Sequence, residues 1–277
     1  RSWSLSTGVL GGLAQPAAIR LLVKALREET SLPVHFHTHD TSGIASATVL
    51  AAVEAGVDAV DAAMDAMSGL TSQPNLGSIV EALRHTDRAT GLDGANIRTI
   101  SGYWEQVRHT YGAFESDLRS GASEVYLHGM PGGQFTNLRE QARSLGIDEV
   151  RWPEVANAYA EVNDMFGDIV KVTPTSKVVG DLAIMMVTSG LTRAQVEDAD
   201  TEVAFPESVV ELMHGDLGQP LGGFPRALQA KVLKGRAPLT ARPGESLPPL
   251  DLVEERAAAE KKCGRALTDG EFASYLM

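Results

Sequence analysis

The chain has 277 residues, of which 43% are hydrophobic and 22% charged, an ordinary composition for a globular protein that buries a core. Its formal net charge of −12 argues against a nucleic-acid partner and against an anionic membrane surface, and no stretch reaches the roughly 18 uninterrupted apolar residues of a membrane span. A single cysteine, Cys263, excludes an internal disulfide and favours a reducing, cytoplasmic setting.

The first part of the chain predicts alternating helices and strands. Residues 16–30 begin with a proline and repeat apolar residues at helical spacing, so they predict an amphipathic helix. A strand is expected at 34–39, an alanine-rich helix at 44–55 stopped by Gly56, and a second strand at 57–64. Such alternation is typical of a parallel sheet of the α/β class.

The pattern changes beyond about Ser101, where it becomes mainly helical, as in YWEQVRHTYGAFESDL and WPEVANAYAEVNDMFG. Two strands cannot close an α/β barrel, so a barrel interpretation requires earlier strands that this chain lacks. The polar residues 85–99 predict a boundary between the two parts, and a looser region, residues 235–249, precedes a last charged helix.

The stretch PVHFHTHDTSG, residues 33–43, carries three histidines at alternate positions. In a strand, His35, His37 and His39 share one face and stand about 7 Å apart, close enough for two of them to bind one ion. They would lie where a barrel strand hands over to its loop, the usual place for chemistry in that fold. The alternative is a buried strand whose histidines hydrogen-bond to their neighbours, and the residues alone leave both interpretations open.

Several motifs resemble, in the same order, the later part of the carboxyltransferase domain of the pyruvate carboxylase family. The resemblance runs from about Gly12 to Met277, and its motifs are HTHDTSG, VDAVDAAMDAMSGLTSQPNLGSI, EVYLHGMPGGQFTNLREQA, FGDIVKVTPTSKVVGDLA and FPESVVELMHGDLGQP. Oxaloacetate decarboxylase α subunits and transcarboxylase large subunits share the barrel, but the phrase SGLTSQPNLG is closer to pyruvate carboxylase.

This resemblance implies an α/β fold: the C-terminal part of a TIM (β/α)8 barrel, HMG-CoA lyase-like, over residues 1–90, and a mainly helical carboxylase region over residues 91–277. It implies carboxyl transfer from carboxybiotin to pyruvate, giving oxaloacetate, within an ATP- and biotin-dependent homo-oligomer. Biotin and ATP use would belong to other domains of that enzyme. The alternatives are a decarboxylase or transcarboxylase subunit, and a catalytically incomplete fragment with a structural role.

The resemblance also implies a divalent metal, zinc or manganese, bound by His37 and His39, with His35 one layer deeper. The family's other ligands are an aspartate on the first barrel strand and a carboxylated lysine in a KDMAGL-like segment. This chain reads STGVLGGLAQP in that segment, and Gly8 falls near the place of the lysine. Glycine has no side chain to bind a metal, so this ligand is missing from the sequence.

A second set of residues lies in the segment VTPTSK. The resemblance implies that Thr173 shuttles a proton between the methyl group of pyruvate and N1 of biotin, a task that suits a hydroxyl because it both donates and accepts. It places Ser176 and Lys177 near the ureido group of biotin, where they could stabilise negative charge. From residue chemistry alone, Thr173 is a helix cap before a proline and Lys177 a solvated lysine.

Two further motifs have weaker expectations. Asp65, Thr71, Ser72 and Gln73 follow the second strand, so they should line the barrel mouth, either contacting a ligand or shaping the loop. His128 precedes a glycine turn, in a motif where the family commonly has an acidic residue in place of Gly129. We therefore interpret that motif as structural.

Overall fold

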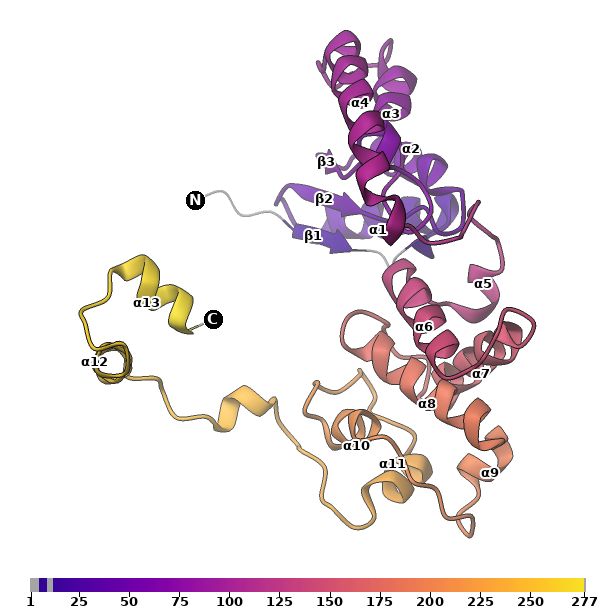
Figure 1. Cartoon of the computed structure of the whole chain (residues 1–277), viewed down its shortest axis with the longest axis vertical. Helices are drawn as coiled ribbons and strands as arrows, with labels where there is room; N and C mark the ends of the chain where they lie inside the picture. Colours follow the sequence, from indigo (N-terminus) through magenta and orange to yellow (C-terminus); the bar gives the residue numbers. More distant parts are fainter. Residues whose placement is uncertain (1–4, 9–11, 277) are drawn as a thin grey trace. The chain divides into compact units, whose positions relative to one another are not determined.

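The computed structural model describes residues 5–8 and 12–276 (Figure 1). It divides into two compact units, residues 1–238 and residues 239–277. The division falls within the loose region that the sequence places before the last charged helix. Among the described helices, none is both long enough and apolar enough to cross a membrane.

A parallel sheet occupies the N-terminal part of the first unit. Its strands are β1 (Leu5–Gly8), β2 (Val34–His37) and β3 (Ala59–Val60), in the order β1-β2-β3. The two predicted strands and their parallel pairing are confirmed, although β3 is far shorter than the expected strand at 57–64. The described strands form an open sheet, and β1 is a strand that the sequence pattern did not predict.

Three helices cover one face of β2. They are α1 (Pro16–Glu29), α2 (Ala45–Ala55) and α3 (Leu76–Leu83), and their apolar side chains form one core with Val34 and Phe36, both 0% exposed. Because side chains alternate along a strand, the histidines of β2 lie on its opposite face. Packing of the helices on one face therefore leaves the other face of the strand to the functional residues.

The rest of the first unit is mainly helical, as predicted. Its core gathers around α7 and α8 and includes Tyr159, Phe166, Leu182 and Met186. In chain order the elements are η2 (Asp65–Met67), α4 (Gly94–Arg108), η3 (His109–Phe114), α5 (Val125–His128), α6 (Gly132–Ser144), α7 (Trp152–Met165), α8 (Thr175–Ser189), α9 (Arg193–Glu197), α10 (Glu207–His214) and α11 (Arg226–Leu233).

The second unit is small. After η4 (Pro243–Ser246) it contains α12 (Leu252–Cys263) and α13 (Asp269–Leu276), and α12 is the last charged helix that the sequence predicts. A core of three residues holds the helices together: Ala259, Leu267 and Phe272. Cys263 is exposed at the end of α12.

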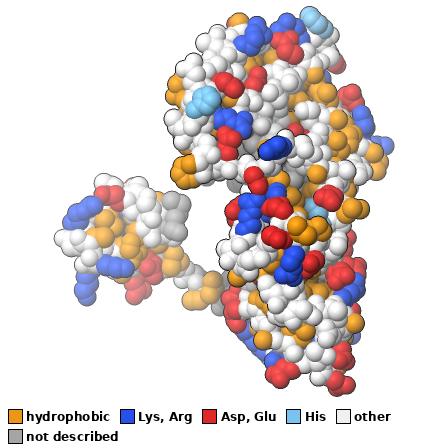
Figure 2. All heavy atoms as spheres, turned by 45° about the vertical axis from the view of Figure 1, so that its right-hand side comes forward, with side chains coloured by type: hydrophobic (Ala, Val, Ile, Leu, Met, Phe, Trp, Pro, Cys, Tyr) orange, Lys and Arg blue, Asp and Glu red, His pale blue; other side chains and the backbone are white. Residues whose placement is uncertain are grey.

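Charges of both signs cover the first unit. Figure 2 shows basic and acidic side chains interspersed over the visible face rather than separated into regions of one sign. Many of them form ion pairs at the surface, such as Arg143 with Asp117 and with Glu149.

Two glycines bring the sheet region and the helical region into contact. The amide of Ala122 donates a hydrogen bond to the carbonyl of Thr41 (3.0 Å), and this draws Gly121 against Gly43. A Cβ atom on residue 121 would lie 2.4 Å from the Gly43 nitrogen and 2.8 Å from its Cα. Both of these atoms belong to the backbone, so neither can rotate away.

We expect Gly121→Ala to lower the free energy of unfolding by about 2 kcal/mol or more, because overpacking against backbone forces the two loops apart. Denaturant unfolding of the variant measures the effect. Gly102→Ala is the matched control: a Cβ there meets nothing within 4 Å in α4, and alanine should stabilise the helix by about 0.5–1 kcal/mol. Equal stability of the two variants would contradict the close contact.

Candidate functional site

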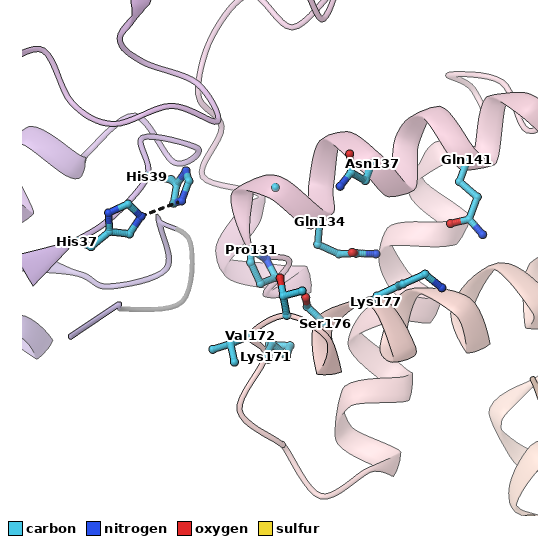
Figure 3. Close-up of a pocket in the computed structure, with 12 residues that line it drawn as sticks. His37, His39, Pro131, Gln134, Asn137, Gln141, Lys171, Val172, Ser176 and Lys177 are labelled. Carbon is cyan, nitrogen blue, oxygen red and sulfur yellow. Dashed lines mark hydrogen bonds between the residues drawn. The ribbon is translucent and has the colours of Figure 1, made fainter. Parts of the chain in front are cut away.

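Two imidazoles converge where β2 ends. The strand expected over 34–39 ends at His37, so His39 lies two residues beyond it, in the loop. Their Nε2 atoms are 3.2 Å apart, and the ring planes meet at 83° (Figure 3). The predicted convergence of these two histidines is therefore present in the fold.

The other ring nitrogen of each histidine is held by an acceptor. Nδ1 of His39 donates to the carbonyl of Thr71 (2.6 Å), and Nδ1 of His37 donates to the carboxylate of Asp61 (2.7 Å). Neither acceptor can donate a proton, so these partners place the proton of each neutral ring on Nδ1. The Nε2 atoms of both rings are then left with lone pairs that point at each other.

This arrangement fits a bound metal ion. Two lone pairs at 3.2 Å repel unless a cation or a proton lies between them. A tetrahedral ion with metal–nitrogen distances of about 2.0–2.1 Å would hold its ligand nitrogens about 3.3 Å apart. Zinc meets this geometry, and manganese also accepts imidazole and oxygen ligands.

Only part of a coordination sphere is present. The described residues contain no group of three or more His, Cys, Asp or Glu side chains placed to hold one ion. In the β1–β2 register Gly8 lies directly opposite His37. The family resemblance expects the carboxylated lysine near this position.

Asp61 connects two of the histidines. Its second oxygen accepts a hydrogen bond from Nε2 of His35 at 2.7 Å, so one carboxylate bridges His35 and His37. Burial alone would raise the pKa of Asp61, but the hydrogen bonds from both histidines hold this pKa below its ordinary value. A charged Asp61 fixes the orientation of His37, as carboxylates commonly do for metal-binding histidines.

A cavity of about 540 Å³ connects the histidines to the helical region. It brings together the two histidines and the three residues of the VTPTSK segment for which the resemblance implied a role, although they lie more than 130 positions apart in the chain (Figure 3). Its lining does not include the residues expected at the barrel mouth: Asp65, Thr71, Ser72 and Gln73. Its lining consists of His37, His39, Pro131, Gly133, Gln134, Asn137, Gln141, Lys171, Val172, Thr173, Ser176 and Lys177.

Thr173 does not cap a helix. The helix α8 begins at Thr175, its N-cap position is Pro174, and no side chain caps it. The hydroxyl that holds this turn belongs to Thr175, which bonds to the carbonyls of Val170 (2.7 Å) and Val172 (2.6 Å). The helix-cap interpretation of Thr173 is therefore wrong, and among the described residues its own hydroxyl has no hydrogen-bond partner.

Ser176 and Lys177 lie in the first turn of α8. Ser176 is buried at 4% exposure, whereas the side chain of Lys177 is 64% exposed. The Lys177 ammonium donates to both oxygens of Asp181 (2.9 and 2.7 Å), and the hydroxyl of Ser208 donates to the same carboxylate (2.7 Å). Lys177 is thus solvated, as its chemistry alone suggested, but it is also held in a defined place at the edge of the cavity.

The loop after β3 contacts the site through its backbone. The Thr71 carbonyl binds His39, and the Ser72 carbonyl accepts the amide of Asp40 at 2.8 Å. The carboxylate of Asp65 accepts the amide of Gly77 at 2.9 Å, so Asp65 shapes the start of α3. Sequence analysis missed the role of the Thr71 carbonyl, since a backbone atom leaves no signal in residue type.

His128 is buried, and its ring stacks on Phe135. Its Nδ1 accepts the amide of Met130 at 3.0 Å, and burial lowers the pKa of His128 from 6.5 to about 4. The folded protein therefore keeps this ring neutral at pH values where the unfolded chain binds a proton. The stability due to the neutral ring is complete above pH 6.5 and is lost as the pH falls towards 4.

We expect this loss to reach about 3 kcal/mol in the free energy of unfolding between pH 6.5 and pH 4. Urea unfolding across this range measures it. His128→Gln keeps a hydrogen-bond acceptor but does not titrate there, so its stability should fall less steeply with pH. If the free energy of unfolding fell with pH equally in the wild type and in His128→Gln, His128 would not be the group that causes the loss.

Comparisons with known proteins agree with this geometry. The sequence profile of the family described as "Conserved carboxylase domain" matches residues 125–277, more than half of the chain. The chain belongs to this carboxylase family. A second profile, described as HMGL-like, matches residues 6–103, the part that contains the parallel sheet and both histidines.

Curated members of the pyruvate carboxylase family match nearly the whole chain. The chain is 46% identical to the pyruvate carboxylase of Bacillus subtilis over 268 residues, which is 97% of this chain and 23% of that protein. It is 45% identical to the mitochondrial pyruvate carboxylase of Mus musculus over 271 residues, with 97% and 23% covered. The chain therefore spans about a quarter of the length of these relatives, and the predicted resemblance is confirmed.

Solved structures match more strongly. The complete multifunctional pyruvate carboxylase of Rhizobium etli superposes with a TM-score of 0.93 at 66% identity, covering 99% of this chain and 27% of that one. The carboxyl transferase domain of the same enzyme, solved with oxamate and biotin, gives a TM-score of 0.92 at 66% identity, with 99% and 46% covered. The same domain has also been solved with pyruvate.

Proposed function

We propose that this chain is the later part of the carboxyltransferase domain of an ATP- and biotin-dependent pyruvate carboxylase. In that enzyme it would take part in carboxyl transfer from carboxybiotin to pyruvate, giving oxaloacetate. The observation that carries the proposal is the single cavity that His37 and His39 share with Thr173, Ser176 and Lys177. The similarity to a carboxyl transferase domain solved with pyruvate and with biotin supports it.

The proposal includes the wider setting of the chain. Residues 1–90 would complete a TIM barrel with strands from other parts of the enzyme, and residues 91–277 would form its helical carboxylase region. The HMGL-like match to residues 6–103 supports the barrel. We further propose a cytoplasmic homo-oligomer, in which other domains carry biotin and use ATP.

His37 and His39 would hold the metal, zinc or manganese. When bound, such an ion acts as a Lewis acid that polarises the ketone oxygen of pyruvate and favours its enolate. Asp61 and the Thr71 carbonyl keep both Nε2 lone pairs directed at one point, so the protein holds half of a coordination sphere in place. The chemistry of the site therefore begins with orientation of these two rings.

Thr173 would move the proton. Its hydroxyl lines the cavity without a hydrogen-bond partner among the described residues, so it is available to accept a proton from the methyl group of pyruvate and to donate one to N1 of biotin. Ser176 and Lys177 would donate hydrogen bonds to the ureido oxygen and stabilise its negative charge. Asp181 keeps the Lys177 ammonium at the cavity edge for this purpose.

A second candidate follows from Gly8. This residue lies beside His37 in the sheet and supplies no ligand where the family resemblance expects a carboxylated lysine. The chain could therefore be a catalytically incomplete fragment that retains the fold. A decarboxylase or transcarboxylase relative would use the same cavity. It would therefore differ from a pyruvate carboxylase in the reaction it catalyses and not in the residues of the site.

The test is a hybrid in which this chain replaces its counterpart in the Rhizobium etli carboxyl transferase domain. The assay is biotin-dependent oxaloacetate decarboxylation, the transfer reaction run backwards. We expect the hybrid with Gly8→Lys to be faster than the hybrid with Gly8 by about tenfold or more. If the folded, metal-loaded lysine hybrid shows no biotin-dependent reaction, the proposed function is wrong.

A further inference from the structure

The cavity contains a lysine that the proposed mechanism does not use. Lys171 is 7% exposed and lines the same cavity as the histidines and Thr173. Among the described residues its ammonium donates no hydrogen bond. The nearest carboxylate oxygen, on Asp168, is 3.9 Å away and belongs to a side chain that is 84% exposed.

Lys171 differs from Lys177, the other lysine of the cavity, in both its exposure and its ion-pair partner. The Lys177 side chain is 64% exposed and its ammonium donates two hydrogen bonds to Asp181, so its charge is both solvated and paired. Lys171 is buried and has only a distant, solvated carboxylate as its counterion. The cavity therefore has one neutralised cation at its edge and one poorly compensated cation within.

No side chain at position 129 compensates Lys171. Gly129 ends α5 with φ 65°, and a Cβ atom there would lie 3.2 Å from the Lys171 ammonium nitrogen. A longer acidic side chain at this position would reach the ammonium, but glycine provides none. The carboxylate that could neutralise Lys171 must therefore come from a molecule that enters the cavity.

A buried ammonium without a partner costs several kcal/mol, because the interior does not replace its hydration. Burial accordingly lowers the pKa of Lys171. The cost is relieved either when the lysine loses its proton or when an anion binds to it. The cavity volume of about 540 Å³ is ample for a small organic anion.

We propose that Lys171 is the anion-binding group of this cavity and that its ligand is the carboxylate of a small organic acid. The choice of a carboxylate rests on the proposed function, whose substrate and product are both carboxylates. Anion binding itself rests only on the burial of Lys171 and its lack of a close partner. In the reaction, Lys171 would hold a carboxylate on the side of the cavity where Thr173 lies.

The test uses the 277-residue chain with malonate as the probe and a chelator present, so that no metal takes part. Isothermal titration at constant ionic strength compares malonate with chloride and phosphate. We expect malonate to bind, and Lys171→Met to weaken its binding by about tenfold or more, the value of one charge-assisted hydrogen bond. Lys24→Met, at an exposed lysine of α1, should leave the affinity unchanged.

A second pair of variants tests the contact between position 129 and the Lys171 ammonium. Gly129→Glu brings an internal carboxylate to Lys171 and should block malonate, whereas Gly129→Ala shares the strain of a positive φ without the charge and should not. Lys171→Met should also unfold at higher urea than the wild-type chain when no anion is present, because it removes a buried charge.

Unchanged malonate affinity in Lys171→Met, or equal binding of chloride, phosphate and malonate, would overturn the proposal. The measurement needs neither metal nor biotin. Its failure would therefore leave the tests of the histidine pair and of Thr173 unaffected, and failure of the hybrid assay would leave anion binding by Lys171 in place.

Discussion

Replacing either His37 or His39 with alanine should weaken zinc binding to the chain by about 100-fold or more. Each ring supplies one of the two nitrogens that converge at 3.2 Å, and one imidazole alone holds zinc poorly. Competition with a chromophoric chelator measures the affinity. The matched control is His85→Ala, at an exposed histidine beyond α3, which should bind zinc as the wild type does.

The same titration tests the role of Asp61. Asp61→Asn removes the negative charge that orients His37 and His35, so we expect a smaller loss of about 10–100-fold. The order of the effects matters, because a group that orients a ligand should contribute less than the ligand itself. If Asp61→Asn bound zinc more weakly than both histidine variants, this assignment would be contradicted.

Replacing Thr173 with alanine should slow biotin-dependent decarboxylation by about 10²–10⁴-fold in the hybrid domain. The hydroxyl is the group proposed to carry the proton, and alanine can neither accept nor donate one. Thr173→Ser keeps the hydroxyl and should retain most of the rate. Zinc affinity should stay the same in both variants, since Thr173 lies outside the histidine pair.

The control for Thr173 is Thr99→Ala, an exposed threonine of α4 whose hydroxyl donates to the carbonyl of Ala95 at 3.0 Å. It should change neither the rate nor the metal affinity. A Thr173→Ala variant that decarboxylates as fast as Thr173→Ser would remove the proton-transfer role. A variant that loses zinc instead would assign Thr173 to the metal site.

Much of the site could be predicted because its signals are local. The alternation of His35, His37 and His39 with Val34 and Phe36 already separates a polar face from an apolar one, and β2 keeps this separation. The helices were equally visible: α1 begins at its proline, and α2 ends at Gly56, whose φ of 102° suits glycine.

The features of the site that the sequence did not predict depend on contacts between distant segments. Asp61 lies 24 positions from His37, and its carboxylate is significant only because β3 runs beside β2. The Thr71 carbonyl and the contact of Gly121 with Gly43 depend on backbone positions that residue types do not encode. Thr173 was misread as a helix cap because the residue chemistry before a proline does not fix which of two threonines starts the helix.

The most direct test of the histidine pair is X-ray absorption at the zinc edge of the chain loaded with one equivalent of zinc. We expect two imidazole nitrogens at about 2.0–2.1 Å, with oxygen ligands completing the sphere. Loss of one imidazole shell in His37→Ala should accompany the loss of affinity. A sulfur shell from Cys263, or zinc without imidazole ligands, would contradict the account.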